Sequence, residues 1–244
     1  MCYNKKVKKN KALTGREVHH LVESARESGK AQSALELAMH TLLTYAKEGD
    51  HLGYAEVLDS VFLTLKNLHR KKAFKPHWIL AGAMVRASVE IAEKSGLKEA
   101  LALPQFNLAQ YLEESGKLVE AKEMYEKAIS SMEQFPSAEH SRPAVLAQMK
   151  LHLALCELIL GDREALGRSK KLLAELAADT GVDSDYNCKV WISGGYLRLA
   201  LYFKDQNIEL AREYLQQAQE IIEGDKRLVL RREHLAKILS EFKE

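Results

Sequence analysis

The breaks between predicted helices recur at a nearly constant spacing along this chain of 244 residues. Apolar residues at intervals of three and four fill most of the chain after Leu13, which is the pattern of amphipathic helices. The turns that join two helices are 43 to 45 residues apart, a period typical of helical solenoids. They fall near Gly29, Lys72, Gly116, Gly161 and Gln206. One pair of helices has an apolar face too wide to bury alone, so we expect stacked neighbours to supply the core.

The periodicity predicts about eleven helices and no strand, arranged as five pairs and one closing helix. Thr14 is placed to cap the first helix, and Glu17 would complete a capping box. Pro76 disfavours helix at the residue before it, which separates the third helix from the fourth. The last helix has the polar outer face expected of a terminal cap. The expected helices cover residues 16–28, 33–49, 54–70, 77–96, 97–114, 118–134, 143–160, 163–178, 184–204, 208–222 and 226–242.

The charge divides the chain into a basic N-terminal tail, residues 1–13, and one helical repeat domain, residues 14–244. The net charge is +2, but five lysines lie in the first eleven residues and leave the rest mildly acidic. A bulk nucleic-acid binder would need a basic face, so we do not expect that class. The tail is either a solvated, flexible segment, which we favour, or a weak contact for nucleic acid or an acidic membrane surface. Its lysines are Lys5, Lys6, Lys8, Lys9 and Lys11.

No set of residues specifies a catalytic chemistry or a cofactor. The chain contains no phosphate-binding glycine loop, HExxH, GxSxG or clustered metal-ligand spacing. Its three cysteines have no CxxC spacing, which indicates neither a disulfide framework nor a zinc site. No run approaches the roughly 20 apolar residues of a membrane helix, and the basic start lacks the apolar stretch of a signal peptide. We expect a cytoplasmic protein that is not an enzyme and binds no metal or cofactor.

The stretch NLAQYLEESGKLVEAKEMYEKAI, residues 107–129, resembles a tetratricopeptide repeat (TPR). It is most similar to the longer repeats of kinesin light chains and related bacterial proteins. The first pair keeps the same offsets, whereas the second departs most and lacks the turn glycine. The resemblance implies an all-α, right-handed superhelical solenoid of about five helix-turn-helix pairs with a C-terminal capping helix. The matching positions are Leu108, Ala109, Leu112, Gly116, Ala121, Tyr125 and Ala128.

The resemblance also implies that the first helix of each pair lines a concave groove, the usual peptide site of the family. Asn107 matches a position where the family often uses an asparagine to hold a peptide backbone, since one amide can donate and accept. Whether the aromatic and leucine positions face the groove or pack in the core stays open. The implied groove residues are His19, Phe62, Lys66, Phe106, Asn107, Gln110, Leu151, Leu155 and Tyr196, with Glu23 and His152 also facing inward.

These patterns favour a protein–protein interaction scaffold or adaptor that binds a peptide segment or partner protein in the groove. The groove row does not match the Lys/Asn/Arg set that grips a C-terminal carboxylate, so we do not expect chaperone-tail binding. The alternative is a regulatory sensor domain that binds a small signal molecule or an oligopeptide, as bacterial regulators resembling this fold do. An enzyme would need a buried cluster of ionisable groups with shifted pKa values.

Overall fold

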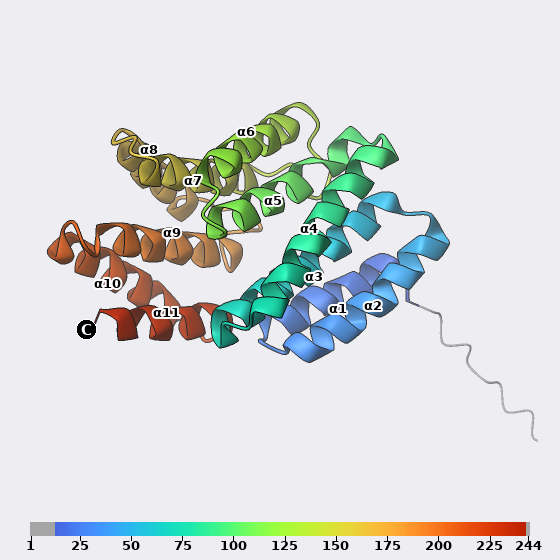
Figure 1. Ribbon diagram of the computed structural model, residues 1–244, viewed down its shortest axis with the longest axis horizontal. Coiled ribbons are helices and arrows are strands. Elements are labelled where there is room, and N and C mark those ends of the chain that lie inside the picture. The colour runs from blue at the N-terminus through green and yellow to red at the C-terminus, as the bar shows by residue number, and fades with distance from the viewer. Residues whose placement is uncertain (1–12, 243–244) are drawn as a thin grey trace, which may run out of the picture.

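The computed structural model describes residues 13–242, which form eleven α-helices, one 3₁₀ turn and no strand (Figure 1). The lysines of the tail, from Lys5 to Lys11, lie outside the described residues. None of the described helices is long and apolar enough to span a lipid bilayer. The helices are α1 (Gly15–Glu27), α2 (Ala31–Glu48), α3 (His51–Lys72), α4 (Lys75–Ser95), α5 (Ala102–Glu114), α6 (Leu118–Gln134), α7 (Pro143–Ile159), α8 (Ala165–Ala177), α9 (Asn187–Phe203), α10 (Ile208–Gly224) and α11 (Val229–Glu241), with η1 (Lys98–Ala100) before α5.

Local signals set most helix ends. The predicted capping box is confirmed, because the Thr14 hydroxyl accepts from the Glu17 N–H and the Glu17 carboxylate accepts from the Thr14 N–H at 2.7 Å. Pro76 lies in the first turn of α4, as its missing N–H predicts. The expected start of the third helix at residue 54 is wrong. Asp50 caps α3 three residues earlier by accepting from the Gly53 N–H at 2.8 Å.

The helices pack as consecutive antiparallel pairs, and each pair stacks on the next along the chain. The small residues Ala109 and Ala121 are fully buried where α5 crosses α6, which lets the two helices approach closely. Tyr125 fills the space beside them and is also fully buried. Tyr45 is its counterpart in the first pair. The fold is therefore an all-α repeat solenoid with a continuous core.

The stack curves until segments far apart in the sequence meet. On one side α11 packs against the C-terminal end of α3 (Figure 1), where Lys71 Nζ lies 2.6 Å from Glu233 Oε1. On the other side the α6–α7 connector, residues 135–142, reaches the first two pairs. There Glu139 accepts from Arg16 at 3.2 Å, and His140 lies 3.6 Å from Glu56. The first helices of the pairs thus surround a central space.

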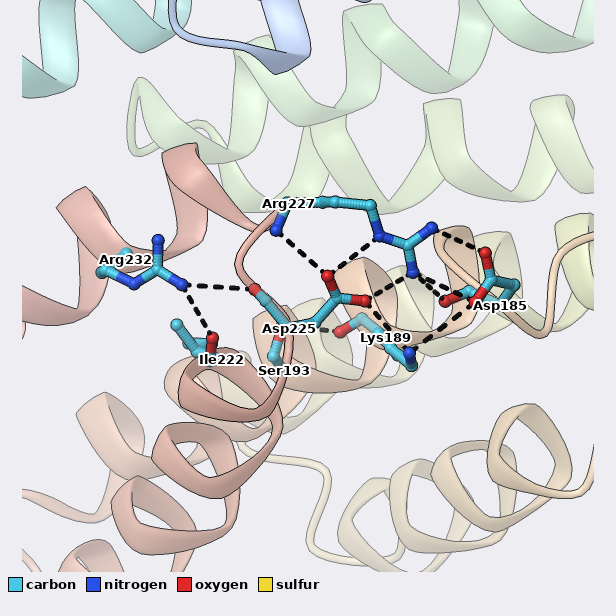
Figure 2. A network of polar contacts seen from close by, with 7 residues as sticks. All are labelled: Asp185, Lys189, Ser193, Ile222, Asp225, Arg227 and Arg232. Atoms are coloured by element: carbon cyan, nitrogen blue, oxygen red, sulfur yellow. Dashed lines mark hydrogen bonds and ion pairs between the residues drawn. The ribbon is translucent and has the colours of Figure 1, made fainter.

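A polar network fixes the direction in which α11 leaves α10 (Figure 2). The Asp225 carboxylate accepts from the backbone N–H and guanidinium of Arg227, and from Lys189 Nζ at 3.0 Å. Arg227 also donates to the Asp185 carboxylate at 2.6 Å. Because Lys189 lies in the first turn of α9 and Asp185 just before that helix, the network ties the α10–α11 turn to the start of α9.

Candidate functional site

A cavity of about 1250 Å³ occupies the centre of the curved stack. Its wall is built by the first helix of every pair, namely α1, α3, α5, α7 and α9. Helix α11 and the α6–α7 connector contribute the remaining sides. The sequence predicts an open groove, whereas the structure has a cavity bridged on two sides by these segments.

Most of the predicted groove residues meet in the wall of this cavity. Phe106 and Asn107 are only 4% and 7% exposed, so the wall is tightly packed around them. The inward positions Glu23 and His152 also lie in the wall. The predicted residues found there are His19, Lys66, Phe106, Asn107, Gln110, Leu151 and Leu155.

Two predicted positions do not line the cavity. Phe62 has no exposed surface and packs in the core shared by the first two pairs, edge-on to Tyr111. Helix α3 is covered on nearly all sides, so the inward register does not bring Phe62 to the cavity. Tyr196 lies on the far side of α9, stacked on Tyr214 at 6.1 Å beside a small hollow between α8, α9 and α10. Both side chains pack helices together, and their assignment to the groove is wrong.

Lys66 brings a buried ammonium group to the cavity. Its Nζ donates to Gln110 Oε1 at 2.6 Å and lies 3.3 Å from Glu114 Oε1. Burial lowers the pKa of Lys66 to about 8. Arg70, one turn further along α3, also pairs with Glu114. Although burial opposes ionisation, Lys66 and Arg70 hold the pKa of Glu114 at about 2.

A second basic group enters the cavity from α9. Arg198 pairs with Glu113, and its Nη1 donates to His152 Nδ1 at 2.8 Å. Tyr125 donates its hydroxyl to Glu113 at 2.7 Å. Burial and the adjacent guanidinium hold the pKa of His152 well below its usual value. His152 is therefore a neutral acceptor in this network.

Arg231 of α11 is the third basic side chain in the cavity wall, and the repeat pattern does not predict it. Its Nε donates to the Val190 carbonyl at 3.0 Å, and its guanidinium lies over the backbone of Gly194. Burial and the nearby Arg70 lower the pKa of Arg231 to about 10. The sequence holds one indirect signal of this contact, the Gly194–Gly195 pair inside a helix. Glycine destabilises a helix interior, so such a pair indicates that another group packs against the backbone there.

Asp59 is a buried carboxyl group in the wall opposite α5. Within residues 13–242 neither of its oxygens has a hydrogen-bond partner of normal geometry. The Asn107 acceptor beside it is already used, because Asn107 Oδ1 accepts from Gln110 Nε2 at 3.1 Å. Burial raises the pKa of Asp59 to about 8, so the group is mostly protonated at neutral pH.

The acidic end of the cavity has the composition of a metal site but is already occupied by a cation. Ligand atoms of Glu56, Glu139 and His140 lie within 4.8 Å of one another. The Arg16 guanidinium pairs with both carboxylates. A metal ion would have to displace this arginine, so the geometry does not favour one.

His19 and Ser60 form the contact closest to a catalytic pair, with His19 Nε2 3.0 Å from Ser60 Oγ. Burial lowers the pKa of His19, which leaves a neutral imidazole. Ser60, however, lies in the middle of α3, where the backbone N–H groups are used in the helix. They cannot stabilise an oxyanion beside the hydroxyl. This pair therefore serves as a structural hydrogen bond between α1 and α3.

The stacked helix pairs around a central cavity define a TPR-like helical repeat fold. BtubC (BKLC) from P. vanneervenii is similar, with a TM-score of 0.55, 15% identity, and coverage of 86% of this chain and 80% of that chain. A protein of Podosopora anserina, of the kinesin light chain type with nearly identical TPR-like repeats, has a TM-score of 0.51 and 18% identity. That match covers 86% of this chain and 96% of the other. No protein-family profile and no curated protein sequence matches the chain. The likeness confirms the repeat fold expected from residues 107–129.

Proposed function

We propose that the chain is a non-enzymatic interaction module that holds a peptide segment of a partner protein in its central cavity. The observation that carries this proposal is the composition of the wall, to which the first helix of every pair contributes. A volume of about 1250 Å³ exceeds the roughly 300–1000 Å³ of small-molecule pockets and suits a peptide segment.

The wall offers both kinds of contact that a peptide needs. Leu103, Trp191 and Leu230 are partly exposed and supply apolar surface for side chains, whereas Leu151 and Leu155 are only 1% and 3% exposed. The amides of Gln148 and Asn187 can each donate to a carbonyl and accept from an N–H. This mixture supports recognition of an extended segment by its backbone and its apolar side chains together.

Peptide selection from a random library, followed by fluorescence anisotropy with one selected peptide, tests the proposal. Asn107→Ala, alone and with Phe106→Ala, should weaken binding by about tenfold or more, because it removes a contact in the cavity wall. Met39→Ala is the control, since Met39 is 62% exposed on α2 and lies outside the cavity. Circular dichroism melting verifies that each variant is folded. Equal loss in the control, or unchanged binding in both folded cavity variants, would contradict the proposal.

A sensor domain is the second candidate, and one observation favours it. Helix α11 and the α6–α7 connector bridge the cavity, so a small molecule or an oligopeptide would be enclosed once bound. A sensor should gain thermal stability from such a ligand and become more compact in small-angle scattering. A partner segment that continues beyond the cavity would instead keep α11 and the α6–α7 connector apart, so the protein would not become more compact.

We also propose that the protein is located in the cytoplasm. Cys156 and Cys188 are free thiols buried in the structure, which suits a reducing compartment. Measurement of the location of the tagged full chain by microscopy tests this point.

A further inference from the structure

Four cationic side chains gather at the end of the cavity where α3, α9 and α11 converge. They are Lys66, Arg70, Arg198 and Arg231, and all four lie in the cavity wall. Two carboxylates pair with them: Glu113 binds Arg198, and Glu114 binds Arg70 and Lys66. The group of four cations, which we call the basic cluster, thus exceeds its carboxylate partners by two charges.

Arg231 is the member without an ion pair. Its Nε donates to the Val190 carbonyl, and within residues 13–242 no carboxylate lies at ion-pair distance from its guanidinium. Glu27 of α1, whose charge acts on Arg231, is held by Arg26 at 2.7 Å and by the Tyr186 hydroxyl at 2.7 Å. The terminal nitrogens of Arg231 are therefore available to a ligand in the cavity.

Two neighbouring histidines are held neutral, mainly by burial and in addition by the surrounding positive charge. Burial, with Arg70 and Arg231 close by, lowers the pKa of His234 to about 3, and the Nδ1 of this histidine has no partner in the described chain. His152 lies near all four members of the basic cluster and is also held neutral, with burial as the main cause. Like charges that crowd in a partly enclosed space repel one another unless an anion joins them.

We propose that the basic cluster is the subsite for a phosphate monoester carried by the ligand of the cavity. A phosphate monoester carries a charge of about −1.5 to −2 at neutral pH, which matches the excess of two positive charges better than a single carboxylate does. A guanidinium binds phosphate through two parallel N–H donors, and a lysine adds a point charge. The inference rests on the proposed function in one respect, since it takes the central cavity to be the ligand site.

The position of Arg231 also links binding to the closure of the stack. Arg231 belongs to α11, whereas Lys66 and Arg70 belong to α3, and exposed pairs such as Lys71–Glu233 hold these helices together. Exposed ion pairs contribute little by themselves. A phosphate bound between α3 and α11 would therefore hold α11 in place and protect its amides from exchange.

Isothermal titration calorimetry on the full chain tests the subsite with three probes: inorganic phosphate, glycerol phosphate and a selected peptide in phosphoserine and unmodified forms. Acetate is the singly charged control. Arg231→Gln removes the free guanidinium. Gly194→Ala displaces it instead, because the new methyl group would come within 2.6 Å of Arg231 Nη2, the flexible end of that side chain. Lys226→Gln removes one charge from the same segment of chain outside the cavity, and is the matched control.

The expected result is binding of at least one phosphate probe that Arg231→Gln weakens by about tenfold or more, and Gly194→Ala by several-fold. Alanine favours a helix over glycine, so Gly194→Ala keeps the test valid even if Arg231→Gln fails to fold. The inference is overturned if no phosphate probe binds, if acetate binds equally well, or if Lys226→Gln causes the same loss. If glycerol phosphate binds and no peptide does, the subsite stands and the peptide function fails. If unmodified and phosphorylated peptides bind equally, the peptide function stands and the phosphate subsite fails.

Discussion

Lys71 Nζ and Glu233 Oε1 are 2.6 Å apart, although 162 positions separate them in the sequence. The contact joins the end of α3 to α11, and Lys237 Nζ adds a bond to the Arg70 carbonyl at 3.3 Å. Through these two contacts, α11 closes one side of the cavity that the helix pairs surround.

Reversal of one charge in this contact should loosen α11. Glu233→Lys places a second ammonium beside Lys71, while Lys71→Glu combined with Glu233→Lys restores the attraction. Hydrogen exchange of residues 229–241 should accelerate in the single variant and return towards the wild-type rate in the double variant. The free energy of unfolding should change by less than about 1 kcal/mol, because both side chains are exposed. Equal exchange in the single and double variants would show that this pair does not hold α11.

Two glycine-to-alanine substitutions should change the stability in opposite directions, because only one of the new methyl groups meets a neighbouring side chain. Gly53→Ala directs a methyl group into the ring of Tyr45, which is fully buried and cannot move aside. We expect a loss of roughly 1–3 kcal/mol in the free energy of unfolding, measured by urea denaturation. Gly167→Ala meets no atom within 4 Å in α8 and should instead add roughly 0.5–1 kcal/mol. Loss of stability in both variants would contradict the packing described for Tyr45.

The Asp59 carboxyl should make stability depend on pH. Its pKa is raised to about 8 by burial, so between about pH 4 and pH 8 the folded state keeps a proton that the unfolded state has released. The contribution of Asp59 to the free energy of unfolding should therefore fall as the pH rises through this window. The groups that face Asp59 are Glu56 on its own helix, the Ser88 hydroxyl from α4 and the Asn107 amide from α5.

Asp59→Asn should flatten this dependence, because the amide does not titrate. Urea denaturation at several pH values should show the variant gaining on the wild type as the pH rises from 4 to 8. Asp205→Asn, at an exposed turn, is the control and should leave the slope unchanged. A difference between Asp59→Asn and the wild type that stays constant from pH 4 to pH 8 would show that Asp59 does not titrate in this window.

The capping box at Thr14 predicts a local loss of stability. Thr14→Ala leaves the first N–H groups of α1 without a side-chain acceptor and should cost about 1 kcal/mol. Thr44→Ala, at a partly exposed position in the C-terminal part of α2, should change stability by less than about 0.5 kcal/mol. Hydrogen exchange of α1 against that of α9 reports whether the effect stays local, as the nearest-neighbour packing of a solenoid predicts. Uniform acceleration along the chain would contradict this.

Particular residues show which parts of the fold could be predicted from the sequence. Gly29 and Gly116 end their helices with positive φ, and Thr14 with Glu17 starts the first one, because these signals act within a few residues. The start of α3 was missed since Asp50 caps it ahead of the apolar pattern.

The candidate site was predicted less completely. The repeat register predicts Phe106, Asn107 and Gln110 at the groove, and all three lie in the cavity wall of the structure. The same register failed for Phe62 and Tyr196, because a helix covered on several sides has no single inward face. The sequence does not predict Arg231 in the cavity wall, because its guanidinium packs against Gly194. Gly194 lies 37 positions earlier in the sequence, and α10 stands between the two helices that carry these residues.

The sequence by itself determined the helices, their pairing and their repeat, because apolar periodicity and helix caps act over one or a few turns. Only the tertiary structure decided that the stack closes, that the groove becomes a cavity and that Lys66, Arg70, Arg198 and Arg231 share one end of it. The physical reason is the curvature of a solenoid. A small rotation at each interface accumulates over five pairs, and no local pattern of residues records the sum.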